Sequence, residues 1–275
     1  MVLADQTRQA ARRLAILLGQ EATALVTGRV SIEVDPRLSF NREGTEVAAL
    51  DMIAQFRALG VESSRLLVKI AATWEGIQAV RRLQTKGIDC NVALVFSEIQ
   101  ALAAADAGAF LISPSVGSVG DWHKARHKLG DARTDDPGVG LVLDVYRTLK
   151  AQRRKTSVMA TSFHSVAQIE AVAGCDLLAI APQLLQQLAA AKGPLRCVLY
   201  PGDIAHSLPE APISESGFRY ILNQSAIATE MLCEGIRGMV ANVDDLETRL
   251  TKLIMDRKRG HGRFDLAHNR VGIVA

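Results

Sequence analysis

The feature that most constrains the fold is a regular alternation, from residue 30 onward, between short apolar runs and longer amphipathic segments. The apolar runs are largely continuous, which is typical of parallel strands that are covered on both faces. The amphipathic segments have helical spacing and several end at glycine, the residue favoured just after a helix. The predicted strands are "VSIEV" (30–34), "LLVKI" (66–70), "NVALVF" (91–96), "AFLISP" (109–114), "SVMATSF" (157–163) and "LLAIAP" (177–182).

Two architectures fit such β/α units, an open doubly wound sheet and a (β/α) barrel. Doubly wound sheets usually carry a glycine-rich phosphate loop after the first strand, and this chain has no GxGxxG motif. We therefore predict an α/β fold of the (β/α) TIM-type barrel class. A complete barrel has eight strands, and only six are convincing here. The barrel is thus expected to be incomplete.

The remaining segments predict how the chain is organised around these strands. We expect one barrel domain over residues 1–254, followed by a basic tail at 255–275, because the last residues are rich in lysine and arginine. The polar stretch 121–140, which contains proline and glycine, is interpreted as a long loop. Helices are predicted near 47–60, 77–87, 97–108, 139–150 and 226–254, with an N-terminal amphipathic helix carrying Leu14, Leu17, Leu18, Ala22 and Leu25.

Composition excludes several classes of function. The formal net charge is +3, and residues 257–275 supply a surplus of four positive charges, so the net charge of the rest of the chain is close to −1. A chain with this charge does not resemble a nucleic-acid binder. No apolar stretch is long enough for a membrane span. The four cysteines are dispersed, which predicts reduced thiols and a cytoplasmic location. The histidines form no metal-binding motif, so we predict neither a metal nor a cofactor.

Lys69 is the most informative residue, because it lies inside an apolar run where a charged ammonium is costly to bury. Side chains on a barrel strand alternate between the interior and the helices. If Val68 and Ile70 face the helices, Lys69 points into the barrel. It is then either satisfied by an interior carboxylate or is a Schiff-base lysine. Poor solvation would lower its pKa, and a neutral amine attacks carbonyl carbons.

Three further polar residues lie in positions to support such chemistry. Glu33 interrupts the first predicted strand and could reach a water molecule between itself and Lys69, or form a plain ion pair with it. An iminium formed at Lys69 would act as an electron sink and allow an adjacent C–C bond to break or form, provided that a proton shuttle is present. Asn91 opens the third predicted strand and could orient a substrate hydroxyl, and Ser113 closes the fourth.

The motifs "VSIEVDPRLSF", "LLVKIAATWEGIQAV", "GIDCNVALVFS", "AGAFLISPSVG", "DPGV" and "AGCDLLAIAP" together resemble the transaldolase family, in order and spacing, from about residue 5 to residue 254. The resemblance implies a Schiff-base enzyme on a (β/α) barrel that moves a dihydroxyacetone unit between sugar phosphates in the pentose phosphate pathway. It implies that Lys69 is the Schiff-base lysine and that Glu33 acts through a catalytic water. Asn91 and Ser113 would contact the substrate.

The chain also departs from the family pattern. The first two barrel strands of the family, which carry a catalytic aspartate, have no counterpart here, and this agrees with the count of six strands. Ala93 stands where the family has a threonine that helps to hold the catalytic water. Ser118 and His164 stand where the family has arginines that bind the substrate phosphate. Ser162 and His164 would then contact an anion more weakly than arginines do.

Two hypotheses follow from this comparison. The chain is either a transaldolase-like transferase acting on sugars or sugar phosphates, with reduced or altered activity, or a non-catalytic relative that binds a ligand or partner. A variant of the second hypothesis is that the true start lies upstream and the chain is a fragment of a longer protein. Because an incomplete barrel exposes strand edges, we also expect that the gap is covered by the N-terminal helix, the C-terminal tail, a second copy of the chain or a separate partner.

Overall fold

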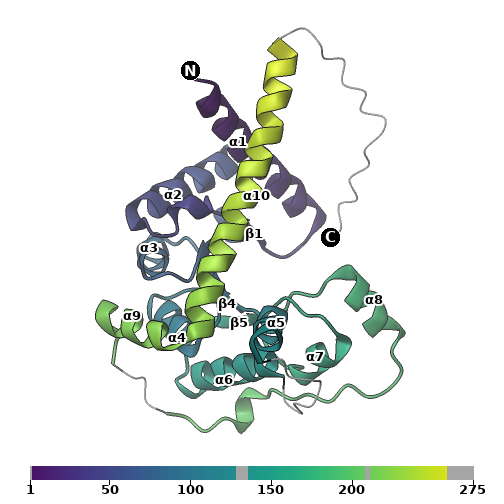
Figure 1. Ribbon diagram of the computed structural model, residues 1–275. Coiled ribbons are helices and arrows are strands. Elements are labelled where there is room, and N and C mark those ends of the chain that lie inside the picture. The colour runs from purple at the N-terminus through teal and green to yellow at the C-terminus, as the bar shows by residue number, and fades with distance from the viewer. Residues whose placement is uncertain (1, 128–135, 208–210, 259–275) are drawn as a thin grey trace.

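The computed structural model describes residues 2–127, 136–207 and 211–258. Six parallel strands form one sheet whose spatial order follows the sequence. The sheet curls into part of a TIM-type barrel, with helices on its outer face (Figure 1). The prediction of an incomplete barrel with six strands is confirmed. The strands are β1 (Val30–Glu33), β2 (Leu66–Ala71), β3 (Cys90–Val95), β4 (Leu111–Pro114), β5 (Ser157–Ala160) and β6 (Leu177–Leu178).

The helices follow the strands in the manner of β/α units, with additional helices before β1, between β4 and β5, and after β6. Helix α1 precedes β1, and the long helix α10 crosses the molecule beside α1 (Figure 1). The α-helices are α1 (Leu3–Leu25), α2 (Arg42–Ala58), α3 (Trp74–Gln84), α4 (Glu98–Asp106), α5 (Val116–His127), α6 (Pro137–Ala151), α7 (Val166–Ala171), α8 (Pro182–Ala190), α9 (Glu215–Gln224) and α10 (Ala226–Lys258). Short 3₁₀ helices span Pro36–Leu38, Ser63–Arg65 and Pro201–Asp203.

The main core lies between the outer face of the sheet and the helices. Val68 and Ile70 of β2 are almost fully buried there with Phe56 of α2 and Ile77 of α3. Since these strand residues flank Lys69, the alternation of the strand directs Lys69 to the opposite, inner face, as the sequence predicted. Burying each such side chain contributes roughly 1.5–3 kcal/mol, so the orientation of β2 is strongly specified.

The carboxyl ends of β2 and β3 are held by one buried amide and covered by α10. Gln100 of α4 is fully buried, and its Nε2 donates to the carbonyls of Ala72 and Leu94. Ala72 directly follows β2, and Leu94 is the last residue but one of β3. Leu94 has a φ of 59° at a register shift in β3, a conformation that is uncommon outside glycine. A second apolar cluster packs α10 against this end through Ala71, Phe96, Val119, Ala228, Leu232 and Ile236.

Two predictions about helices need correction. The stretch 121–140 is not one long loop: α5 continues to His127 and α6 begins at Pro137, while residues 128–135 lie outside the described part. From Asp121 to Arg126 no residue of α5 is buried, so this part of the helix lacks the apolar periodicity that would predict it. Helix α1 is confirmed, but its buried positions include Ala11, Ile16 and Gly19. The leucines expected to be buried are partly or largely exposed. The helix packs through Gly19 instead, because the missing side chain there lets α1 come close to Phe56 and Ile32.

Helix α10 extends four residues beyond the predicted domain boundary at residue 254, to Lys258. The rest of the predicted basic tail, 259–275, lies outside the described residues. The division into one domain and a tail stays a prediction.

A cluster of ion pairs ties the carboxyl end of β1 to α10. Arg37 donates to Asp35 and to Glu247, with Nη2 at 2.8 and 2.6 Å from their oxygens, and lies 3.5 Å from Asp244. These hydrogen bonds, to Glu247 first and then to Asp35, raise the pKa of Arg37. Burial alone would raise the pKa of Asp35, but the hydrogen bonds and charge of Arg37 outweigh it and lower that pKa.

We expect Arg37→Gln to lower the free energy of unfolding by about 1 kcal/mol at neutral pH, as for a partly exposed ion-pair network. Because the folded pKa of Asp35 is lowered, the stability it contributes is present above its unfolded pKa of about 3.9 and is lost as pH falls through the folded value. Urea unfolding measures the difference in the free energy of unfolding between the Arg37→Gln variant and the unmodified chain. This difference should therefore be smaller at pH 3 than at pH 7. Arg42→Gln, which removes an exposed pair with Glu43, is the control. Equal effects of both variants at both pH values would contradict the prediction.

Candidate active site

The inner face of the sheet carries the lysine–glutamate pair that the sequence predicted. Glu33 of β1 lies directly opposite Lys69 of β2 in the parallel register. Lys69 Nζ donates to Glu33 Oε2 at 3.3 Å. Their side chains are 33% and 34% exposed, so this face is more solvated than the closed interior that the sequence suggested. The incomplete barrel accounts for this, because β1 is an edge strand.

The direct contact between Lys69 and Glu33 bears on the two interpretations of Glu33. At 3.3 Å no water molecule fits between the two atoms, so the pair in this structure is an ion pair. A role for Glu33 through a water requires the two side chains to separate.

Beside this pair, on the same face of the sheet, lies a row of hydrogen-bonded side chains. Asn91 lies opposite Lys69 in the register and is 2% exposed. Ser113 Oγ donates to Asn91 Oδ1 at 2.6 Å, and Asn91 Nδ2 donates to Ser31 Oγ at 3.2 Å. The amide of Asn91 is thus fixed from both sides, with its orientation defined by two hydroxyls. The structure brings Glu33, Lys69, Asn91 and Ser113 together on one face.

Ser31 is a member of this row that the sequence analysis missed. It lies two residues before Glu33, so it shares the inner face of β1 by the period of two of a strand. That spacing is a signal that could have identified it. Beyond the row, the next inner-facing positions on β2 and β3 are Ala71 and Ala93, which pair in the register. Ala93 offers no hydroxyl to a water molecule near Lys69.

The other two predicted residues, Ser162 and His164, lie in the loop after β5, next to the start of α5. Ser162 has a φ of 61°, and its carbonyl accepts from the Gly117 backbone N–H at 2.8 Å. His164 Nε2 lies 2.8 Å from Asp121 Oδ2. Among the hydrogen bonds of the described residues, none joins this loop to the row on the inner face. The predicted site is therefore formed by two separate groups.

The start of α5 has little capacity left for binding an anion. Helix N-termini bind phosphate through free backbone N–H groups, but the N–H of Val116 donates to Thr161 and that of Gly117 donates to Ser162. The hydroxyl of Ser115 donates to the hydroxyl of Ser118 at 2.8 Å. Ser118, the residue found where an arginine was expected, therefore already has a hydrogen-bond partner. The carboxylate of Asp121 adds a negative charge beside His164. These contacts disfavour a phosphate group here.

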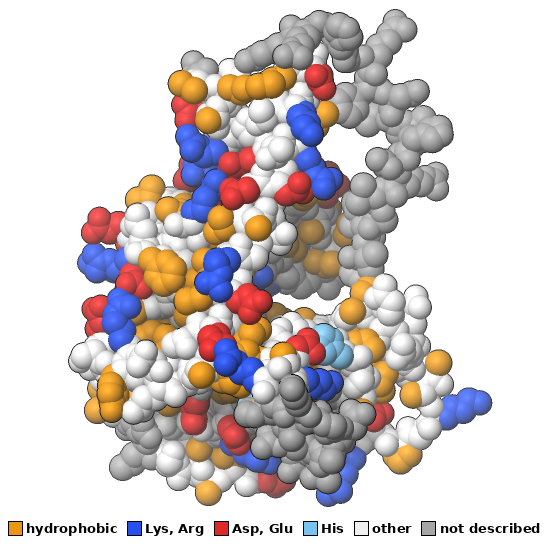
Figure 2. Space-filling view, viewed as in Figure 1, with side chains coloured by type: hydrophobic (Ala, Val, Ile, Leu, Met, Phe, Trp, Pro, Cys, Tyr) orange, Lys and Arg blue, Asp and Glu red, His pale blue; other side chains and the backbone are white. Residues whose placement is uncertain are grey.

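Other chemistries find little support. Burial raises the pKa of the Cys90 and Cys175 thiols, which makes them poor nucleophiles. Within the described ranges, no group of three His, Cys, Asp or Glu side chains could hold a metal ion, and no helix is long and apolar enough to cross a membrane. On the face shown in Figure 2, Lys and Arg side chains are interspersed with Asp and Glu rather than gathered in one basic patch.

The fold and the site together define the class of protein. It is a partial (β/α) barrel that carries a lysine, a carboxylate and an amide on its inner face. The family model for transaldolase and fructose-6-phosphate aldolase matches residues 2–250. A transaldolase of Cellvibrio japonicus (strain Ueda107) is 46% identical over 248 residues, covering 90% of this chain and 78% of that protein. A transaldolase of Rhizobium etli (strain CIAT 652) is 46% identical over 244 residues, covering 88% and 75%. The chain belongs to the transaldolase/fructose-6-phosphate aldolase family.

Solved structures add nothing to this assignment. The GMP reductase of Trypanosoma brucei, in complex with guanosine 5'-monophosphate, has a TM-score of 0.38 and 18% identity, covering 57% of this chain and 30% of that protein. That likeness is too weak to inform the function.

Proposed function

We propose that the chain is a transaldolase-like transferase in which Lys69 forms a Schiff base with the carbonyl group of a sugar or sugar phosphate and a dihydroxyacetone unit is transferred. The observation that carries this proposal is the contact between Lys69 and Glu33 on the inner face, beside the fixed amide of Asn91. No metal or cofactor is required, because the iminium itself accepts the electron pair of the breaking C–C bond.

The reaction assigns a role to each member of the row. The amine of Lys69 attacks the carbonyl carbon, and loss of water gives the iminium. A base then takes the proton of the hydroxyl next to the bond that breaks, an aldehyde leaves, and an enamine remains on Lys69 until it attacks the acceptor aldehyde. Glu33, released from its ion pair, serves as the proton shuttle through a water. Asn91 and Ser113 hold substrate hydroxyls, with Ser31 fixing the amide of Asn91.

The proposal includes an altered preference for substrate charge. The polar groups at the start of α5 are occupied by one another, and Asp121 lies beside His164. We therefore infer that Ser162 and His164 contact the distal part of the substrate and that a phosphate there is bound weakly. An uncharged donor such as dihydroxyacetone loses less from this arrangement than fructose 6-phosphate does.

The alternative, a non-catalytic protein that binds a ligand or partner, is motivated by Ala93 and by the weak phosphate site. It leaves Lys69 and Glu33 as a partly exposed ion pair with no chemical role. That a second copy or a partner covers the open edges of the sheet stays a prediction.

Borohydride trapping tests the proposed function. The full chain is incubated with dihydroxyacetone, and separately with fructose 6-phosphate, then reduced, weighed intact and mapped by peptide mass. We expect a stable adduct at Lys69, with more of it from dihydroxyacetone than from fructose 6-phosphate at equal concentration. An adduct at another lysine, or none from folded protein with either compound, would reject the Schiff-base assignment and favour the binding protein.

A further inference from the structure

Helix α1 carries an apolar stripe that the described part of the chain leaves uncovered. Leu17, Leu18 and Leu25 are exposed, and Leu14 is partly exposed. The spacing of these four leucines places them on one side of the helix, because residues three, four and seven apart share a face. Leucines gathered in this way on a surface are typical of an interaction site, whereas single exposed leucines are not.

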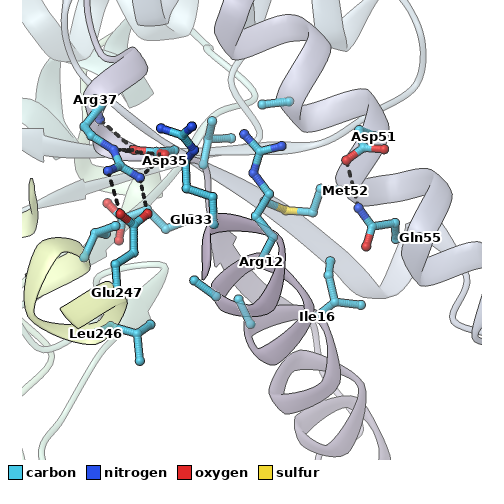
Figure 3. Close-up of a pocket in the computed structure, with 16 residues that line it drawn as sticks. Arg12, Ile16, Glu33, Asp35, Arg37, Asp51, Met52, Gln55, Leu246 and Glu247 are labelled. Atoms are coloured by element: carbon cyan, nitrogen blue, oxygen red, sulfur yellow. Dashed lines mark hydrogen bonds and ion pairs between the residues drawn. The ribbon is translucent and has the colours of Figure 1, made fainter. Parts of the chain in front are cut away.

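The core side of α1 is a different one, and it is already packed. Ile16 lines one cavity together with Met52 of α2 (Figure 3), and Gly19 lies close to Phe56. The N-terminal part of α1 also packs on α10, and Figure 1 shows α1 extending past the place where α10 crosses it. Turning the helix to bury the leucines would expose these contacts, so the stripe needs another partner.

A carboxylate within the stripe limits what that partner can be. Glu21 lies four residues after Leu17 and four before Leu25, so it is on the same side of the helix. Arg13 borders the stripe one turn before Leu17, and both charged side chains are exposed. Among the hydrogen bonds and ion pairs of the described residues, none involves either side chain. A purely apolar partner would bury the carboxylate without compensation, which is costly.

The stripe is complementary to itself in one arrangement. Arg13 lies four residues before Leu17, and Glu21 lies three residues after Leu18. If two copies of α1 pack antiparallel with these leucines at the two-fold axis, Arg13 of each copy lies beside Glu21 of the other, offset by about 1.5 Å along the helix. A parallel pair would instead place like charges side by side.

We propose that α1 pairs with α1 of a second copy of this chain to form a two-fold symmetric dimer. The leucines pack at its centre, and two ion pairs between Arg13 and Glu21 flank them. A single helix pair is smaller than the standard protein interface of about 1,200–2,000 Å², so we expect a dissociation constant on the order of micromolar. The surface is separate from the inner-face row and does not depend on covalent chemistry at Lys69.

Sedimentation equilibrium of the full chain, at concentrations that span the micromolar range, tests the dimer. We expect a reversible equilibrium between monomer and dimer. Arg13→Glu and Glu21→Arg should each raise the dissociation constant about tenfold, because each places two like-charged pairs at the interface. The double variant Arg13→Glu/Glu21→Arg restores both pairs with reversed sign and should dimerise as the unmodified chain does.

A substitution at the centre of the stripe checks its location. Leu18→Asp should abolish the dimer, because it places two carboxylates next to the two-fold axis. Leu185→Asp on α8 is the matched control, since Leu185 is 55% exposed and Leu18 is 54% exposed, and it should leave the dimer unchanged. Circular dichroism checks that each variant is folded.

Three outcomes would each overturn the proposal. These are a chain that stays monomeric throughout the range, a double charge variant that dimerises no better than the single ones, and equal effects of Leu18→Asp and Leu185→Asp. Failure of borohydride trapping at Lys69 would leave these results unaffected.

Discussion

Lys69→Met is expected to abolish the reducible adduct and to lower transferase activity by about 10³-fold or more, because the covalent route is lost altogether. Methionine has a similar length and no charge, so it can occupy the inner face without opening a gap in the sheet. The partner that loses its ion pair, Glu33, is one-third exposed, so water can solvate it and the fold should persist. Activity is measured with dihydroxyacetone or fructose 6-phosphate as donor, and folding by circular dichroism.

Lys86→Met is the matched control for this experiment. Lys86 forms a surface ion pair with Glu46 at 2.7 Å and is 44% exposed, so the same substitution removes a pair of similar exposure away from the inner face. We expect it to leave both adduct and activity unchanged. If Lys69→Met retained activity while remaining folded, Lys69 would be only the ion-pair partner of Glu33, and the proposed mechanism would be wrong.

Gly138→Ala is expected to destabilise the chain by about 3 kcal/mol, the upper part of the usual range for overpacking. A Cβ at this position would lie 1.9 Å from the backbone carbonyl oxygen of Val116. Backbone cannot give way as a flexible side chain can, so either α5 or α6 must shift. The same position begins α6, where Asp136 accepts from the Gly138 N–H at 2.8 Å, so the shift would also disturb the helix cap.

Gly140→Ala provides the comparison within the same helix. No atom lies within 4 Å of a Cβ built at Gly140, so the change should be neutral or stabilise by about 0.5–1 kcal/mol, as alanine does in helices. Urea unfolding of both variants measures the difference. If the two variants were equally stable, the close approach of α5 and α6 would not be a constraint on the fold.

The sequence predicted most of what positions the site. The apolar runs placed all six strands, and the position of Lys69 between Val68 and Ile70 defined its face, because the period of a strand is local information. Lys69, Glu33, Asn91 and Ser113 then met through strand register alone. Ser31 followed the same rule and was overlooked.

Features that depend on tertiary contacts could not be predicted in the same way. The pairing of His164 with Asp121 joins the loop after β5 to α5, 43 residues earlier, and nothing in the sequence links them. The polar sequence of α5 hid a helix because no residue from Asp121 to Arg126 is buried. In α1 the leucines suggested one buried face, whereas Gly19 determines the actual one through its contact with Phe56.

The ion pairs of Arg37 have a consequence for the order in which the chain folds during its synthesis. They fix Arg37, four residues after the end of β1 at Glu33, to Glu247, which is 210 residues later in the sequence. During synthesis on the ribosome, which proceeds from the N-terminus, β1 is therefore made about 210 residues before the acidic group on α10 to which it is tied. The strand that carries Glu33 can pair with β2 before then, but its contact with α10 is expected to form only after Glu247 has been made.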